Sequence, residues 1–124
     1  MSKAANEEQW ERVCNAADVH PFIGVRALIG ERQVAIFRVG GSFYAIDAVD
    51  PFSRAAVLAR GLVGDLKGQL VVASPVYKHH FNLCTGMCLE DSTVCLATYP
   101  VRETGGCIEI GPVQAILELE SCVA

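Results

Sequence analysis

The apolar residues of this chain fall into many short runs rather than a few long ones. Such runs cover residues 9–14, 24–29, 33–39, 42–47, 70–73, 93–99 and 107–110. They are rich in Val, Ile, Phe and Tyr, and residues that favour turns separate them, which is typical of β-strands joined by tight connections. The pattern therefore predicts an all-β domain built as a small sandwich or barrel.

Glycine pairs predict where this chain reverses direction. Gly40 and Gly41 separate the apolar runs at 33–39 and 42–47. A two-residue turn of this kind needs φ > 0 at both central positions, which glycine adopts without steric cost, so we expect a tight hairpin. Gly105 and Gly106 predict a closing hairpin in the same way, and the glycines within 61–72 predict another.

Two stretches favour helix. Residues 55–60 favour a helical turn, and residues 112–119 favour a short amphipathic helix with Pro112 at its first position, although a strand extension fits almost as well. We expect a flexible N-terminus at 1–8, one β domain at 9–111 and a tail at 112–124.

Length and charge exclude several classes of partner. A chain of 124 residues is expected to be one domain that buries a sufficient core. The net charge of −4, without a cluster of Lys or Arg, argues against nucleic-acid binding. No apolar run approaches the roughly 18 residues that span a bilayer, and residues 1–8 show no apolar signal core. We therefore expect a cytoplasmic protein that does not bind membranes.

The six cysteines, at positions 14, 84, 88, 95, 107 and 122, are expected to be thiols. Disulfides are the expectation for secreted chains, and the apparent lack of a signal segment removes that premise. Cys14, Cys95 and Cys107 lie among apolar strand residues, so we expect them to be small buried side chains.

Polar rings gather in residues 72–86. The strand at 70–73 leads into a Ser-Pro turn, then into a loop with Tyr77, His79 and His80, then into a second short strand. This strand–loop–strand arrangement presents side chains at a tip, where functional residues often lie. With Asp50, these residues form the cluster in which we look for chemistry.

Three interpretations of this tip remain open. Asp50 and Tyr77 with either histidine would form an acid/base or hard-metal site, although adjacent histidines on a strand point to opposite faces. His79 with Cys84 and Cys88 would suit Zn²⁺, but no second ligand pair follows. The third interpretation is a solvated tip that contacts another protein.

Two other kinds of functional motif are not found in the sequence. The glycines lack the spacing of a nucleotide-binding loop, and no Ser-His-Asp order stands out.

The tip resembles Rieske [2Fe–2S] domains, which hold their cluster between a Cys-x-His loop and a loop that often reads Cys-Pro-x-His-Gly-x-x-Phe, with Thr-Gly further on. Residues 74–81 here are Ser-Pro-Val-Tyr-Lys-His-His-Phe, residues 85–86 are Thr-Gly, and residues 50–52 are Asp-Pro-Phe. The four ligand positions therefore hold Asp50, Phe52, Ser74 and Tyr77. A Rieske cluster needs two thiolates and two imidazoles, so the resemblance implies a Rieske-like β fold that has lost its cluster.

A second resemblance, to the small subunits of assimilatory NAD(P)H-dependent nitrite reductases, covers most of the chain and ends near residue 111. The segments that carry it are Trp-x-x-Val-Cys at 10–14, Gln-Val-Ala-Ile-Phe-Arg-Val at 33–39, Ala-Ile-Asp-x-x-Asp-Pro-Phe-Ser at 45–53, Arg-Gly-x-Val-Gly-Asp at 60–65, Val-Ala-Ser-Pro-x-Tyr-Lys-x-His-Phe at 72–81, Cys-Leu-Glu-Asp at 88–91 and Tyr-Pro-Val-Arg at 99–102.

This resemblance implies an accessory, non-catalytic small subunit beside a large subunit that carries FAD, a [4Fe–4S] cluster and sirohaem and reduces nitrite to ammonia with NAD(P)H. No metal or cofactor is expected on this chain. The alternatives are a Rieske-type ferredoxin that carries electrons, or a small hard-metal protein that uses Asp50, Tyr77 and His79.

The expected partner interface is the face that once held a cluster. Its candidate residues are Phe52, Arg54, Tyr77, Lys78 and His79, because aromatic and Arg side chains at a loop tip are favoured in interfaces. The alternative is that Phe52 and Tyr77 fold inward and fill the space left by the cluster.

Overall fold

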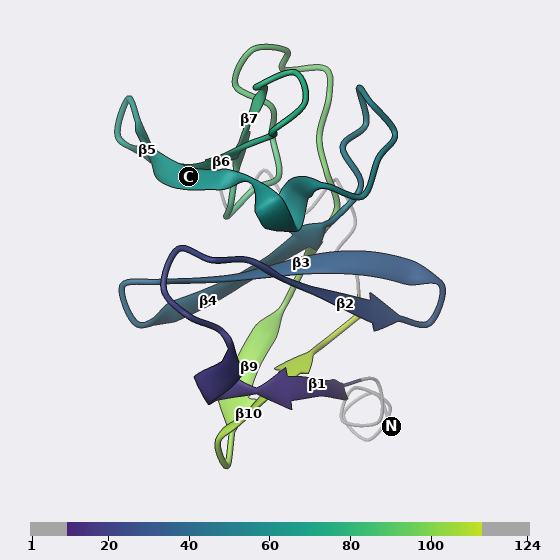
Figure 1. Ribbon diagram of the computed structural model, residues 1–124, viewed down its shortest axis with the longest axis vertical. Coiled ribbons are helices and arrows are strands. Elements are labelled where there is room, and N and C mark those ends of the chain that lie inside the picture. The colour runs from purple at the N-terminus through teal and green to yellow at the C-terminus, as the bar shows by residue number, and fades with distance from the viewer. Residues whose placement is uncertain (1–9, 113–124) are drawn as a thin grey trace.

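The computed structural model describes residues 10–112, which form three antiparallel sheets (Figure 1). The first sheet has the order β1 (Glu11–Asn15), β10 (Cys107–Ile110), β9 (Val101–Thr104); the second has β2 (Val25–Ile29), β3 (Arg32–Val39), β4 (Ser42–Asp47), β8 (Thr98–Tyr99); the third has β5 (Leu62–Leu66), β6 (Gln69–Ala73), β7 (His80–Asn82). Two single-turn 3₁₀ helices, η1 (Ala16–Asp18) and η2 (Leu58–Arg60), join them. The all-β prediction is confirmed.

The centre of the four-stranded sheet is buried on both faces. Val34 and Ile36 of β3 contribute to a core shared with β10, whereas Ala35 and Phe37 contribute to a core shared with β6 and β7. Because successive strand residues point to opposite faces, a strand between two cores must be apolar without interruption, which explains the continuous run at 34–37. In Figure 1 this sheet crosses the middle, with the third sheet above it and the first below.

The hairpins follow the predicted turns. Gly40 and Gly41 have φ of 59° and 84° between the paired ends of β3 and β4. Gly105 and Gly106 close the hairpin of β9 and β10 in the same conformation. Between β5 and β6 the turn is made by Lys67 and Gly68 at φ of 55° and 81°. Three of the predicted connections are thereby confirmed.

The segment before β8 contains less strand than expected. The run at 93–99 contributes only Thr98–Tyr99 to the sheet. The residues before them pair with the segment after β7 instead, since the Cys88 N–H donates to the Val94 carbonyl at 3.0 Å and the Leu96 N–H donates to the Gly86 carbonyl at 2.8 Å. The helical turn expected at 55–60 is shorter, at Leu58–Arg60. Within the described residues no helix is long and apolar enough to cross a membrane. The N-terminus at 1–8 and all of the expected helix beyond residue 112 lie outside the described part.

The cysteine predictions need correction. Cys14, Cys95 and Cys107 are only half-buried, whereas Cys88 is fully buried. Cys88 pairs with Phe81 in an isolated β-bridge and belongs to the core beneath the third sheet, a placement that strand periodicity did not reveal. Burial raises the pKa of the Cys88 thiol.

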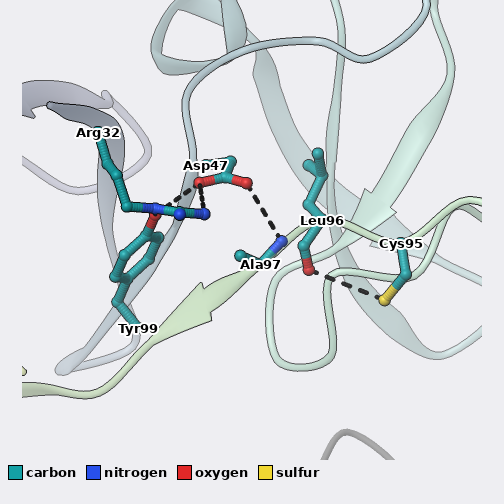
Figure 2. Close-up of polar contacts among 6 residues, drawn as sticks. All are labelled: Arg32, Asp47, Cys95, Leu96, Ala97 and Tyr99. Atoms are coloured by element: carbon teal, nitrogen blue, oxygen red, sulfur yellow. Dashed lines mark hydrogen bonds and ion pairs between the residues drawn. The ribbon is translucent and has the colours of Figure 1, made fainter. Parts of the chain in front are cut away.

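A polar cluster joins β8 to the sheet (Figure 2). The Tyr99 hydroxyl donates to Asp47 Oδ1 at 2.6 Å and accepts from Arg32 Nε at 2.6 Å, and Asp47 Oδ2 accepts from the Ala97 N–H at 3.3 Å. Burial and the bond to Asp47 raise the pKa of Tyr99 to about 12, against the opposing effect of Arg32. This cluster fixes the end of β4 directly before the segment that carries Asp50.

Candidate functional site: a pair of matched loops

Two loops contain the four positions that the Rieske resemblance aligns with cluster ligands, and both loops have the same backbone turn. The first loop (residues 50–54) leaves β4, and the second loop (residues 74–78) joins β6 to β7. In the first, the Arg54 N–H donates to the Asp50 carbonyl at 2.6 Å; in the second, the Lys78 N–H donates to the Ser74 carbonyl at 3.0 Å. Each turn ends on a residue in the left-handed region, with φ of 65° at Arg54 and 66° at Lys78.

The side chains that open the two loops also match. Asp50 Oδ1 accepts the Phe52 N–H at 2.8 Å, and Ser74 Oγ accepts the Val76 N–H at 3.3 Å. Short polar side chains often stabilise a turn by bonding the backbone two residues on. The same two side chains bond to each other, since the Ser74 hydroxyl donates to Asp50 Oδ2. The loops are therefore tied together at their bases.

This link lies in the interior. Asp50 and Ser74 both have 0% exposed surface. Within residues 10–112 Asp50 forms no ion pair, so its carboxylate is compensated by the Phe52 N–H and the Ser74 hydroxyl. A buried polar group without partners is costly, and removal of either partner would leave such a group behind.

The aromatic positions of the two loops differ. The Phe52 ring stacks on the His79 ring at 3.8 Å with an interplanar angle of 10°, lies 6.3 Å from the Phe81 ring, and packs against the core beneath the third sheet. Tyr77 remains 59% exposed, with its ring edge-on to His79 at 6.5 Å. The Phe52 ring therefore points inward, whereas the Tyr77 ring points outward.

The two histidines diverge, in keeping with the strand geometry expected for neighbours. His79 is stacked on Phe52, and its buried Nδ1 atom has no hydrogen-bond partner among the described residues 10–112. His80 begins β7 and pairs through Nδ1 with Glu90 Oε2 at 2.6 Å, while its N–H donates to Glu90 Oε1 at 2.8 Å. Burial opposes ionisation of Glu90, but these contacts outweigh it and hold its pKa below the usual value.

The donor atoms that the two metal-site interpretations require do not lie together in the described part of the chain. Both Asp50 oxygens are already bonded, Tyr77 faces outward, and His80 is paired with Glu90. For zinc, Cys84 is exposed while Cys88 is buried beneath the sheet. Among residues 10–112 no group of three His, Cys, Asp or Glu side chains is placed to hold a metal ion.

The turn after β7 depends on a side chain that sequence reasoning overlooked. Asn82 Oδ1 accepts the N–H groups of Cys84 and Thr85 at 2.7 and 2.9 Å, which shapes the turn after β7. Gly86 follows with φ of 82°, where a Cβ would lie 2.2 Å from the Leu96 carbonyl oxygen. An Asn three residues before Thr-Gly is a turn signal that could have been recognised.

Comparison with known proteins identifies relatives of this arrangement. A family model described as "Rieske-like [2Fe-2S] domain" matches residues 9–111. The Escherichia coli K12 "Nitrite reductase (NADH) small subunit" is 41% identical over 104 residues, covering 82% of this chain and 96% of the relative. The solution structure of the Erwinia carotovora nitrite reductase [NAD(P)H] small subunit superposes with a TM-score of 0.73 at 41% identity, covering 86% of this chain and 84% of that one.

A further relative contains the domain within a longer chain. The Klebsiella oxytoca "Nitrite reductase [NAD(P)H] large subunit" is 35% identical over 112 residues, which cover 90% of this chain but 12% of that protein. The domain is thus found both as a separate small subunit and as part of a large one.

The family description implies an iron–sulfur cluster, and the residues at the four ligand positions do not fit one. Phe52 has no donor atom, the Asp50 and Ser74 oxygens are bonded to each other, and Tyr77 points outward. Rieske ligation needs two thiolates on one iron and two imidazoles on the other. Asp50 and Ser74, at two of the four positions where the family description implies metal ligands, instead hydrogen-bond to each other.

Proposed function

This chain belongs to the family of nitrite reductase small subunits with a Rieske-like domain, and from that premise we propose that it is the accessory, non-catalytic subunit of a cytoplasmic assimilatory nitrite reductase. In this role it binds the large subunit, which carries FAD, a [4Fe–4S] cluster and sirohaem and reduces nitrite to ammonia with NAD(P)H. The observation that carries the proposal is the match to 96% of the length of a small subunit at 41% identity.

The longer Klebsiella relative supports association with the large subunit. In that protein the matching region belongs to the same polypeptide as the rest of the large subunit. A covalent link gives a high effective concentration, and a separate chain must replace it with an interface. We therefore propose a stable complex rather than a transient electron-carrier encounter.

The geometry of the loops supports a recognition role at their tips. Arg54, Tyr77 and Lys78 are exposed, and the exposed Val76 lies beside Tyr77. The turns beneath them are tied by the buried Asp50–Ser74 bond, and the Phe52–His79 stack fills the space between. We propose that Arg54, Tyr77 and Lys78 contact the large subunit while Phe52 and His79 hold the tips in place. A rigid tip loses little entropy on binding, which favours affinity.

Co-purification with the large subunit tests the proposal. Tagged small subunit should retain the sirohaem subunit, and nitrite reduction by the large subunit alone should fall below that of the complex. If the tagged chain retains no large subunit and its deletion leaves nitrite reduction intact, the proposal is wrong.

Iron and acid-labile sulfide analysis of the purified small subunit tests the electron-carrier alternative. Two irons and two sulfides per chain would establish a ferredoxin-type cluster and overturn the accessory role. The non-matching ligand positions predict neither.

A further inference from the structure

A hollow of about 220 Å³ opens where the start of β2 passes beneath η2. Its walls are formed by Gly24, Arg26, Ala56, Ala59 and Arg60. Both arginines are exposed, and within the described residues neither has a carboxylate in ion-pair range. Arg26 Nη1 donates to the Ala56 carbonyl at 3.3 Å, which holds this guanidinium at the rim. As far as residues 10–112 are concerned, the hollow is therefore a positive site without a counter-charge.

The backbone determines the walls of this hollow. A Cβ on Gly24 would lie 2.3 Å from the Ala59 carbonyl oxygen and 2.7 Å from Phe37 Cε1, so only glycine allows the approach to η2. Leu58 anchors η2 from the other side, since it is fully buried and its N–H donates to the Ala48 carbonyl at 3.0 Å. Arg26 in β2 and Arg60 in η2 therefore extend from backbone segments that are held in place by packing.

An apolar pair adjoins the hollow. Phe22 and Ile23, directly before Gly24, are 57% and 61% exposed. Phe22 has φ of 67°, a conformation that costs energy for a bulky residue, and its N–H donates to the Arg38 carbonyl at 3.0 Å. Exposed aromatic and arginine side chains beside each other are typical of protein interfaces.

We propose that this hollow receives a carboxylate side chain of the large subunit, with Phe22 and Ile23 covered by apolar residues beside that carboxylate. The inference rests on the proposed function and adds a second contact to it. The chain as a whole carries a net charge of −4, but two neighbouring arginines without an acidic partner among residues 10–112 form a local positive site suited to an acidic segment. The exposed apolar pair favours a protein segment over a free anion, which would gain nothing from it.

The position of the hollow would allow one partner surface to cover both the loop tips and the hollow. Ala56 and Arg60 follow the first loop along the chain, and η2 lies between the upper loops and the four-stranded sheet (Figure 1). A partner that contacts the loop tips could therefore extend over η2 to the hollow.

Affinity measurements with paired arginine variants test this inference. The intact small subunit is immobilised, and the large holo-subunit is titrated onto it at low and high salt. Three proteins are compared: wild type, the double variant Arg26→Gln with Arg60→Gln, and the control Arg12→Gln. Arg12 is an exposed residue of β1. The double variant should bind at least about tenfold more weakly and respond less to salt, because truncating a charge pair weakens binding and removes its screening. Arg12→Gln should bind as wild type does. Ile23→Ser should weaken binding without changing the salt response.

Each other outcome has a defined meaning. If the double variant binds like the control while its thermal unfolding matches wild type, the hollow is not a contact and the inference is wrong, although the proposed function stands. If wild type itself does not bind, the proposed function fails and the inference fails with it. If acetate or nitrite shifts the amide resonances of residues 24, 26 and 60 while the double variant keeps its partner affinity, the occupant is a free anion. If the isolated chain dimerises through these residues, the occupant is a second copy. Both results would overturn the inference.

Discussion

The first and second loops have the same backbone turn, and yet the aromatic side chain of the first packs inward while that of the second is exposed. Phe52 lies inward on His79, whereas Tyr77 is exposed at the tip. Both loops begin with a buried polar side chain that bonds the backbone two residues on. The comparison shows that the turn is held by its first residue, which leaves the aromatic position free to support the fold in one loop and to face solvent in the other.

The bond between the loops should have the largest effect on stability. Asp50→Ala removes the acceptor of the Ser74 hydroxyl and of the Phe52 N–H, and we expect a loss of about 3 kcal/mol in the free energy of unfolding, because buried donors are left unpaired. Urea denaturation measures it. Asp50→Asn, which keeps an acceptor, should lose less.

A double-mutant cycle with Ser74→Ala separates the bond from the individual side chains. A coupling of about 1 kcal/mol or more would confirm that positions 50 and 74 stabilise each other directly. Additive effects would show that each side chain acts only within its own turn, and the loops would then not be linked through this bond.

The inward aromatic residue should come next. Phe52→Ala removes a half-buried ring from between His79 and the core, and we expect a loss of about 2 kcal/mol, less than for a fully buried phenylalanine. Thermal unfolding of the isolated chain measures it. Unchanged unfolding with a loss of large-subunit binding would instead assign Phe52 to the interface.

The outward aromatic residue should affect binding rather than folding. Tyr77→Ala should change the free energy of unfolding by less than about 0.5 kcal/mol, since the side chain is 59% exposed, and should weaken large-subunit binding about tenfold. Calorimetric titration measures the binding. A destabilised variant with intact affinity would reverse the roles assigned to Phe52 and Tyr77.

The smallest effect concerns the residues that end the turns. Lys78→Gly relieves a left-handed conformation at the position where the Rieske pattern has glycine, and we expect a gain of about 0.5 kcal/mol in the free energy of unfolding. Arg54→Gly should give the same sign if the turns are equivalent. Lys67→Gly, in the exposed turn between β5 and β6, is the matched control for strain relief away from the loops. A loss at Lys78 with a gain at Lys67 would show that the lysine side chain itself stabilises the second loop.

Local pattern was sufficient for much of the fold. Paired glycines predicted the turns at 40–41 and 105–106, since φ > 0 depends on the residue itself. The run at 34–37 predicted a strand, and its lack of alternation already reflected burial on both faces. The pattern overestimated the strand at 93–99, because residues 94–96 form their backbone hydrogen bonds with the turn at 86–88 rather than with the four-stranded sheet.

The sequence by itself determined the strands, the turns and the loss of Cys and His at the ligand positions, because these depend on residue type and on neighbours along the chain. The tertiary structure alone decided that Asp50 and Ser74, 24 residues apart, bond to each other, that Phe52 lies inward and Tyr77 outward, and that Arg26 and Arg60 line one hollow. These contacts join segments from different sheets and connections. Their distances depend on how the sheets pack, and no local periodicity encodes that packing.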